Sequence, residues 1–272
     1  MVGRVAVVMP AYNAERWVRG TLNSLMNQNY ENFVVFAVND GSEDQTESIL
    51  REYAALYPEK MRVLSQGNKG CGEALNTGFD AVNEEGGFDY GTMVSADNLY
   101  FPNFLYTLAT ALDYESSSIV MVYADFNYIN ERNEITHSMI HTPKDRNDLV
   151  NGYDQGMAFM FRMHAKNSAG RYWKRICEDY PMAVKIAEHG DFRLVPLVLA
   201  AFRVSQAQLT GSNKMEEDRA AEYSRRLARR VLRKEEVDLS EVYPKGVDPW
   251  KHRYDDDVVP REGEVAESLD NV

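Results

Sequence analysis

The sequence is short of the features that mark several protein classes. Its 272 residues include only two cysteines, Cys71 and Cys177, so a disulfide framework is excluded and a reducing compartment is expected. The longest uncharged apolar run, 194–202, has nine residues, whereas a membrane-spanning helix needs about 20. Residues 1–9 lack the charged start and long apolar run of a signal peptide. We therefore expect a soluble, cytoplasmic protein.

The sequence also lacks the signatures of two common nucleotide-binding folds. No Gly-x-Gly-x-x-Gly follows the first expected strand, which argues against a nicotinamide-binding domain. The glycine-rich segment 67–78 lacks the Gly-Lys-Ser/Thr ending of a Walker loop. Basic residues are outnumbered, with 30 Lys and Arg against 42 Asp and Glu and a formal charge of −12. That balance argues against a protein that binds nucleic acid without sequence preference.

What the sequence does contain is a regular alternation of apolar β-rich runs and amphipathic helical segments. Strands are predicted at 4–9, 33–39, 61–65, 90–95 and 118–123, and helices at 14–27, 44–57, 71–82 and 102–114. This alternation predicts an α/β protein with a mostly parallel sheet and helices on both faces. Ligands then bind outside the carboxyl ends of the strands, in the loops after Met9, Val38, Ser65 and Val94.

The second half of the chain follows a different pattern. A β-hairpin is predicted around 130–133, strands at 157–162 and 192–202, and helices at 179–189 and 214–237. Residues 214–234 carry eight bases and four acids, whereas 235–272 carry four bases and twelve acids. The amphipathic helix 214–237 could therefore lie on an anionic membrane surface, or pack on its own domain or on a second subunit with its basic face in solvent. The acidic tail 238–272 is expected to be poorly ordered.

Each of the four loops carries side chains that suit a nucleotide, although each also has a plainer interpretation. Tyr12 can lie against a nucleobase or be an ordinary surface tyrosine. Asp40 can accept a hydrogen bond from a ribose or a base, or only shape a turn and helix cap. The glycines of 67–78 allow close backbone approach to an anion at a helix start. Asp97, beside Asn98, can ligate a divalent cation that bridges a diphosphate.

The order and spacing of these motifs are more specific than any one of them. The series consists of PAYNAE at 10–15, NDGSEDQT at 39–46, NKGCGEALNTG at 68–78, and SADN followed by PNFL at 95–105. It closely resembles the family-two glycosyltransferases with the GT-A fold. The resemblance implies a GT-A, Rossmann-like, mostly parallel sheet flanked by helices, to which the residue pattern adds a C-terminal helical extension and tail. The implied organisation is a glycosyltransferase domain at 1–213, with a nucleotide-binding half at about 1–115 and an acceptor half at about 116–213, then the helix 214–237 and the tail 238–272.

In that family the first three motifs, with a contribution from the fourth, hold the nucleotide. The resemblance therefore implies nucleotide binding by Pro10, Ala11, Tyr12, Asn13, Glu15, Asn39, Asp40, Asn68, Lys69, Gly70 and Ala96. Tyr12 would lie against the base, Asp40 would bind the base or ribose, and Lys69 would contact a phosphate. The family's usual Asp-Asp pair reads Asn39-Asp40 here, so one carboxylate has become an amide.

The metal motif of the family is also incomplete in this chain. Its Asp-x-Asp pattern aligns with 95–97, where Ser95 replaces the first acid and Asp97 remains as the implied metal ligand, with Asn98 as a supporting neighbour. One carboxylate fewer predicts a weakly held Mn²⁺ or Mg²⁺ whose other ligands come from the sugar diphosphate. Further on, Ser205 stands where relatives carry the histidine of an Arg-x-His pattern, which removes another contact.

The segment ICEDY at 176–180 resembles the family's Glu-Asp-Tyr/Trp segment, whose Asp is the general base. Asp179 is therefore the implied base, and a helix N-terminus is expected to keep its carboxylate ionised at neutral pH. Glu178 would orient loops or the acceptor, whereas the plainer alternative is that both acids only cap a helix. Trp173 is either a platform for an acceptor sugar or a core residue.

The resemblance implies an inverting glycosyltransferase of polysaccharide or glycoconjugate biosynthesis. It would move a sugar from a nucleoside diphosphate, expected to be UDP, to a hydroxyl of a saccharide, glycolipid or protein. Two alternatives stay open: a non-catalytic or weakly active nucleotide-sugar binding protein, indicated by Ser95 and Ser205, and a sugar-1-phosphate nucleotidyltransferase, whose glycine-rich basic loop is missing at 10–15. The cytoplasm is the expected location, with a peripheral contact at the inner face of the membrane or a homodimer through 214–237 as further options.

Overall fold

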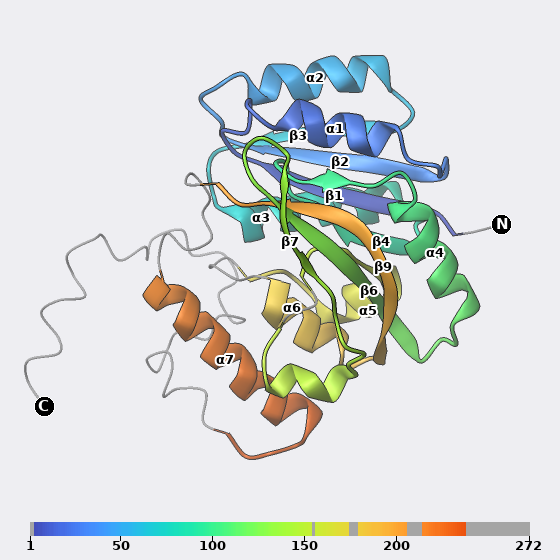
Figure 1. Cartoon of the computed structure of the whole chain (residues 1–272), viewed down its shortest axis with the longest axis vertical. Coiled ribbons are helices and arrows are strands. Elements are labelled where there is room, and N and C mark those ends of the chain that lie inside the picture. The colour runs from blue at the N-terminus through green and yellow to red at the C-terminus, as the bar shows by residue number, and fades with distance from the viewer. Residues whose placement is uncertain (1–2, 154–155, 174–178, 206–213, 238–272) are drawn as a thin grey trace, which may run out of the picture.

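In the computed structural model, residues 3–153, 156–173, 179–205 and 214–237 are described, and they form a nine-stranded sheet with helices on both faces (Figure 1). The strands are β1 (Val5–Ala11), β2 (Phe33–Asp40), β3 (Met61–Gln66), β4 (Tyr90–Met93), β5 (Leu99–Tyr100), β6 (Ile119–Ile129), β7 (Ile135–Met139), β8 (Phe159–Arg162) and β9 (Asp191–Arg203). The helices are α1 (Val18–Met26), α2 (Thr46–Leu56), α3 (Cys71–Glu85), α4 (Phe104–Tyr114), α5 (Met163–Ala169), α6 (Asp179–Ile186) and α7 (Lys214–Leu232), with a 3-10 turn η1 (Arg146–Val150).

The sheet has the order β3-β2-β1-β4-β8-β6-β9-β5, and β7 pairs with β6 off this path. The first four strands are parallel, since β1 pairs in parallel with β2 and β4, and β2 with β3. The loops that follow them therefore lie along one edge of the sheet. In the second half, β8 is antiparallel to β4 and β6, whereas β9 runs parallel to β6 over a long register. The mostly parallel sheet predicted from the sequence is confirmed.

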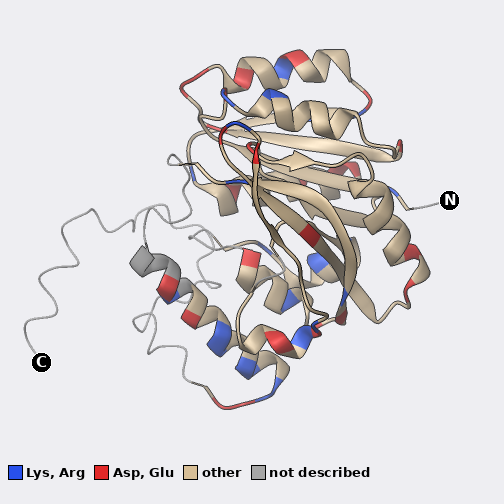
Figure 2. Ribbon diagram, in the orientation of Figure 1, with Lys and Arg blue, Asp and Glu red and all other residues tan. Residues whose placement is uncertain are grey.

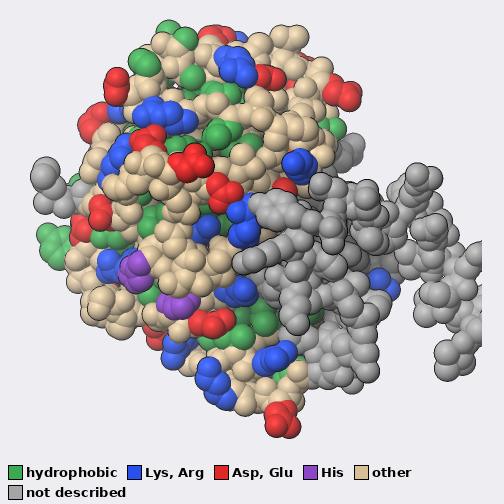
Figure 3. Space-filling model, turned by 180° about the vertical axis from the view of Figure 1, so that it is seen from behind, with side chains coloured by type: hydrophobic (Ala, Val, Ile, Leu, Met, Phe, Trp, Pro, Cys, Tyr) green, Lys and Arg blue, Asp and Glu red, His purple; other side chains and the backbone are tan. Residues whose placement is uncertain are grey.

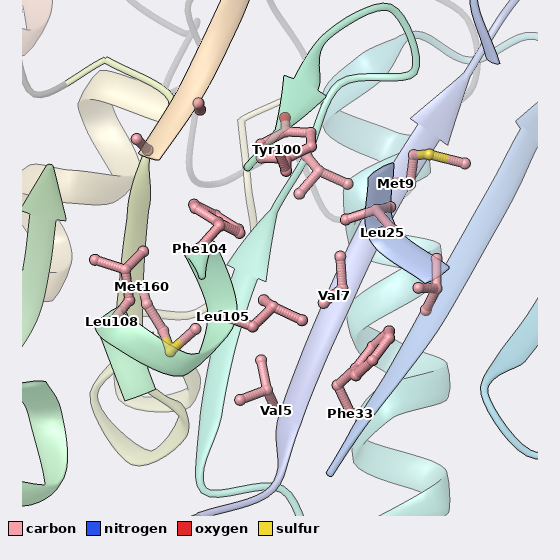
Figure 4. Packing of buried hydrophobic residues seen from close by; sticks show 14 of the residues in the cluster. Val5, Val7, Met9, Leu25, Phe33, Tyr100, Phe104, Leu105, Leu108 and Met160 are labelled. Atoms are coloured by element: carbon pink, nitrogen blue, oxygen red, sulfur yellow. The ribbon is translucent and has the colours of Figure 1, made fainter. Parts of the chain in front are cut away.

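The central strands are apolar along their length because both of their faces are covered. One face packs against α1, α2 and α4, where Val5, Val7 and Met9 of β1 face Leu25 and Phe104 (Figure 4). The other face packs against α3, α5, α6 and α7 in a second cluster. Seen from behind, the surface mixes acidic and basic side chains with scattered hydrophobic ones (Figure 3).

Helix α3 lies close to the sheet because a glycine faces it. A Cβ atom added at Gly78 would lie 2.4 Å from Cγ1 of Val8 in β1 and 3.3 Å from Cγ2 of Val38 in β2. Any larger residue would push the helix away from the strands. This contact fixes α3, which begins at the third of the predicted nucleotide-binding loops, against β1 and β2.

Most predicted elements are present, with differences where the sequence signal is weak. The predicted strand at 90–95 ends at Met93, and the hairpin around 130–133 joins β6 to β7. The two-residue strand β5, the turn η1 and the helix α5 were not predicted. Helix α5 has seven residues, MHAKNSA, too few to display an apolar period.

The C-terminal helix α7 packs on its own domain, against α6 and η1. Tyr223, Leu227 and Ala228 are buried there, so this face of the helix packs on its own domain. The helix ends at Leu232 rather than 237, and Lys and Arg gather on its later turns (Figure 2). Over the described ranges, none of the helices combines the length and the apolar character needed to cross a bilayer. The predicted poorly ordered tail, 238–272, lies outside the described residues.

Candidate active site

The loops after β1 and β2 are tied to each other by reciprocal hydrogen bonds. The backbone N–H of Asn13 donates to Oγ of Ser42 (3.0 Å), and the N–H of Glu43 donates to Oδ1 of Asn13 (2.9 Å). Glu15 accepts from the N–H of Gln45 at 2.9 Å. Asn13 adopts a φ of 47°, a conformation that asparagine tolerates better than most residues. The two loops therefore form one unit.

The first motif begins inside the sheet and then turns outward. Pro10 and Ala11 are the last residues of β1, paired with Val38 and Asn39 of β2. Tyr12 follows with 42% of its surface exposed. An exposed ring directly after a strand end is available to stack on a planar ligand, as the sequence predicts for a nucleobase.

Asp40 is buried and organises the glycine-rich loop. Its side chain is 3% exposed and accepts three hydrogen bonds, from Nε2 of Gln66 (2.7 Å), the N–H of Lys69 (2.9 Å) and the N–H of Gly70 (2.9 Å). Gly70 has a φ of 87°, which permits the sharp entry into α3. Asn68 and Lys69 are exposed on the same loop. In this structure Asp40 shapes the loop that would carry the ligand.

The amide of Asn39 is explained by its neighbour Glu47. Nδ2 of Asn39 donates to Oε2 of Glu47 (3.0 Å), and its Oδ1 accepts from the N–H of Ser42 (3.1 Å). Hydrogen bonding to Arg51 lowers the pKa of Glu47, so its carboxyl is ionised. A second carboxylate at position 39 would face that charge without a proton to donate. The site needs one donor and one acceptor here, which asparagine supplies.

The fourth loop, after β4, is held in place by hydrogen bonds to Tyr100 and Arg203. Tyr100 accepts from the N–H of Ser95 (2.9 Å), and Ala96 is buried. Asn98 is fully buried, and its Oδ1 accepts from the N–H of Arg203 (2.8 Å). Asp97 is half-buried, and its backbone carbonyl accepts from Nε of Arg203 (2.8 Å). Asn98 therefore supports the loop, and Asp97 carries its carboxylate.

Arg203, at the end of β9, is a buried connection that sequence reasoning did not assign. Beyond its bonds to the fourth loop, it donates to the carbonyl of Asn130 (3.0 Å) and to Oδ1 of Asn133 (2.8 Å) in the β6–β7 hairpin. Its guanidinium lies 4.1 Å from the ring centre of Trp17. Burial lowers the pKa of Arg203, and the charge of Asp97 opposes that effect. The arginine in FRVS was visible in the sequence, but its partners are distant along the chain.

A divalent cation would find only part of its ligand set in the protein. Among the residues that the structure describes, no group of three His, Cys, Asp or Glu side chains is arranged so that it could hold a metal ion. The Oδ1 atom of Asn98 is buried and already accepts a hydrogen bond from Arg203, which leaves Asp97 to offer a ligand oxygen in this loop. A single carboxylate fits Mg²⁺ or Mn²⁺ when phosphate oxygens supply other ligands.

Asp179 is the first residue of α6, on the face of the sheet that α3 also covers. Its Oδ1 accepts from the N–H of Tyr180 (2.8 Å), and it lines a small cavity with mainly apolar walls, to which Tyr153, Phe159 and Tyr172 contribute. Burial raises the pKa of Asp179 and outweighs the backbone hydrogen bonds that lower it. The expectation that a helix start keeps this carboxyl ionised omitted that larger effect.

Of the two residues predicted near Asp179, one is in the core. Trp173 is 3% exposed, and its ring centre lies 5.5 Å from that of Tyr223 in α7. It therefore occupies the core position of the two alternatives rather than presenting a face to a sugar. Glu178 lies outside the described residues.

Solved structures share this arrangement of sheet and helices. The S. aureus protein TarS, crystallised with UDP-GlcNAc, is 18% identical, with a TM-score of 0.67 over 88% of this chain and 69% of that one. The mannosyltransferase PcManGT of Pyrobaculum calidifontis, in complex with GDP-Man and Mn²⁺, is 17% identical, with a TM-score of 0.63 over 88% of this chain and 66% of that one. The chain thus has the GT-A fold of glycosyltransferases. Residues 6–175 match the model of glycosyl transferase family 2, and the chain belongs to that family.

Curated relatives agree with the family. An uncharacterized glycosyltransferase of Rickettsia typhi is 32% identical over 142 residues, which cover 52% of this chain and 41% of that protein. Chondroitin synthase of Escherichia coli is 30% identical over 191 residues, which cover 70% of this chain and 27% of that protein. This chain spans less than half the length of these relatives.

Proposed function

We propose that the protein is an inverting glycosyltransferase that moves a sugar from a nucleoside diphosphate, preferably UDP, to a hydroxyl of a saccharide, glycolipid or protein. The observation that carries this proposal is the interlocked set of loops at the carboxyl ends of β1 to β4. Asp40 holds the glycine-rich loop there, and Arg203 holds the loop that carries Asp97. Nucleotides bind at this edge of parallel sheets, and family membership favours glycosyl transfer over nucleotidyl transfer.

In the proposed reaction Asp179 is the general base. The acceptor oxygen attacks the anomeric carbon from the face opposite the diphosphate, while the bond from that carbon to the phosphate oxygen breaks. The bonding electrons leave with the nucleoside diphosphate, and the hydroxyl proton passes to the carboxylate of Asp179. The raised pKa of Asp179 makes its ionised form a stronger base. One displacement of this kind inverts the anomeric configuration.

The donor end of the site is assigned to the loops already described. The ring of Tyr12 would stack on the base, and Lys69, exposed at the start of α3, would contact the diphosphate together with the helix N-terminus. Asp97 would hold a weakly bound Mn²⁺ or Mg²⁺, which would neutralise charge on the departing diphosphate.

A second candidate, a protein that binds a nucleotide sugar without transferring it, is favoured by the single carboxylate of the metal loop. Thermal-shift screening of UDP- and GDP-sugars, each with and without Mn²⁺ or Mg²⁺, separates donors from non-ligands. Hydrolysis of the best donor then separates an enzyme from a binding protein, because transferases slowly donate sugar to water. We expect stabilisation by a UDP-sugar that increases with metal, together with slow hydrolysis. Stabilisation without hydrolysis or transfer would favour the binding protein, and no response to any donor would contradict both candidates.

A further inference from the structure

Helix α3 connects the proposed donor loops to the rest of the molecule as a rigid element. At its start, the N–H groups of Lys69 and Gly70 are held by Asp40. In its middle, Gly78 packs directly against the side chain of Val8 in β1. The helix therefore cannot tilt or slide without breaking contacts at either point. A side chain that leaves α3 toward another segment would place that segment accurately relative to the donor site.

Asn76 is such a side chain, and it binds a backbone segment 96 residues further along the chain. Its Oδ1 accepts from the N–H of Tyr172 (2.7 Å), and its Nδ2 donates to the carbonyl of Tyr172 (3.1 Å). The second proton of Nδ2 is used by Oε2 of Glu73 (2.7 Å). Asn76 is 2% exposed, so these bonds are shielded from water. Both polar groups of one peptide residue are therefore fixed by one amide.

The residue that Asn76 holds is part of the wall around the proposed base. Tyr172 is 3% exposed and lines the same small cavity as Asp179. Its ring stacks on Phe79 of α3, with ring centres 5.6 Å apart and planes 17° from parallel. Nζ of Lys166 lies 4.5 Å from the ring centre of Phe79 and 5.7 Å from that of Tyr172. The wall is therefore pinned to α3 at its backbone by Asn76 and at its ring by Phe79.

We propose that Asn76 is a positioning residue for the reaction: through Tyr172 it sets the place of Asp179 relative to the donor loops. This inference rests on the proposed role of Asp179 as base. The position demands a side chain that donates and accepts together, which an aspartate or an aliphatic residue of similar size does not do. A shift of about 1 Å in a reacting group can lower a rate by about 100-fold.

The same helix offers a matched control. Asn83 lies two turns after Asn76 and also joins α3 to the second half of the chain, since its Oδ1 accepts from Nδ2 of Asn167 (3.0 Å). That bond is exposed and holds α5 rather than the cavity wall. Asn76→Ala and Asn83→Ala therefore each remove one side-chain amide from α3. Only Asn76→Ala removes the hydrogen bonds that hold Tyr172.

The test compares kcat, donor KM and the pH profile of kcat/KM in the full chain. We expect Asn76→Ala to lower kcat by about 10- to 100-fold, to leave the donor KM within about 2-fold of wild type, and to move the acid limb of the pH profile. Asn83→Ala should match wild type in all three, and Asn76→Ser, which keeps part of the bonding, should be intermediate. A merely structural role for Asn76 would lower the melting temperature and leave the acid limb in place.

Three further outcomes would overturn the proposal. These are a wild-type kcat in a folded Asn76→Ala protein, equal losses in Asn76→Ala and Asn83→Ala, and failure of both Asn76 variants to fold, which would assign the residue to stability. Asp179→Asn, assayed in parallel, distinguishes this failure from failure of the proposed function. If Asp179→Asn turns over normally, the base assignment itself is wrong. If Asp179→Asn is inactive while Asn76→Ala is fully active, only the positioning role falls.

Discussion

Replacing Asp179 by asparagine is expected to abolish most activity and at the same time to stabilise the fold. The amide cannot take a proton from the acceptor, and loss of a general base typically costs about 10²- to 10⁴-fold in rate. Asparagine keeps the oxygen that accepts from the N–H of Tyr180, and it caps helices about as well as aspartate. What changes in the folded state is the charge beside a mainly apolar cavity.

The direction of the stability change follows from the pKa of Asp179. Burial raises that pKa in the folded protein above its value of 3.8 in a model peptide. The folded state therefore binds more protons than the unfolded state between the two pKa values, so this carboxyl lowers the stability of the wild type as the pH rises through that window. The amide escapes the cost, and we expect Asp179→Asn to gain on the order of 1 kcal/mol at pH 7. In a chain of 272 residues this raises the melting temperature by about 2 °C or more.

The assay combines donor turnover with thermal melts of both proteins between pH 4 and pH 8. The difference in melting temperature should be small at the acid end and grow with pH, because only the wild type carries the buried charge. An Asp179 that acts only as a helix cap would leave turnover intact, although its burial would still give the same pH-dependent difference in melting temperature. Normal turnover, or a variant that becomes less stable with rising pH than the wild type, would refute the reasoning.

Three further substitutions test the supports of the site. Asp40→Asn turns a donor toward the N–H groups of the glycine-rich loop. Calorimetry should show weaker UDP binding, and denaturant melts should show a loss of about 2 kcal/mol in the free energy of unfolding. Unchanged UDP affinity would show that Asp40 does not shape the loop for binding. Arg203→Ala removes three side-chain hydrogen bonds and a contact with Trp17. In denaturant melts we expect the free energy of unfolding to fall by about 3 to 5 kcal/mol. A fall below about 1 kcal/mol would show that the fold does not need the contacts of Arg203. Gly78→Ala places a methyl group 2.4 Å from a carbon of Val8. Urea melts should show that the free energy of unfolding falls by about 1 to 3 kcal/mol. An unchanged midpoint would mean that α3 does not pack on β1 as described.

The sheet could be predicted from the sequence because its signal is local. The run VVFAVN in β2 is apolar on both faces, and a strand of that kind belongs in the middle of a parallel sheet. The loops after the strands followed from the same reasoning, since parallel strands end at one edge. Helix α5 and strand β5 were missed because seven and two residues hold too little periodicity.

The hydrogen bonds and packing contacts within the site could not be predicted, because they join residues that are far apart in the chain. Asp40 and Lys69 were both named as ligand contacts, but the bond between them that shapes the loop appears only when β2 and β3 pair. The burial of Trp173 depends on α7, more than 40 residues later. The sequence places an acid at 179 at a helix start, but the pKa of Asp179 is set by the cavity around it, to which Tyr172 and β8 contribute.

The central claim, inverting transfer from a nucleotide sugar, is tested most directly by the anomeric configuration of the product. The donor chosen by thermal shift is incubated with an acceptor, and proton NMR follows the anomeric signals from the first turnovers. The account predicts that an α-linked nucleotide sugar gives a β-linked product, which appears as the nucleoside diphosphate is released. An α-linked product, or release of a nucleoside monophosphate with the sugar phosphate intact, would contradict it.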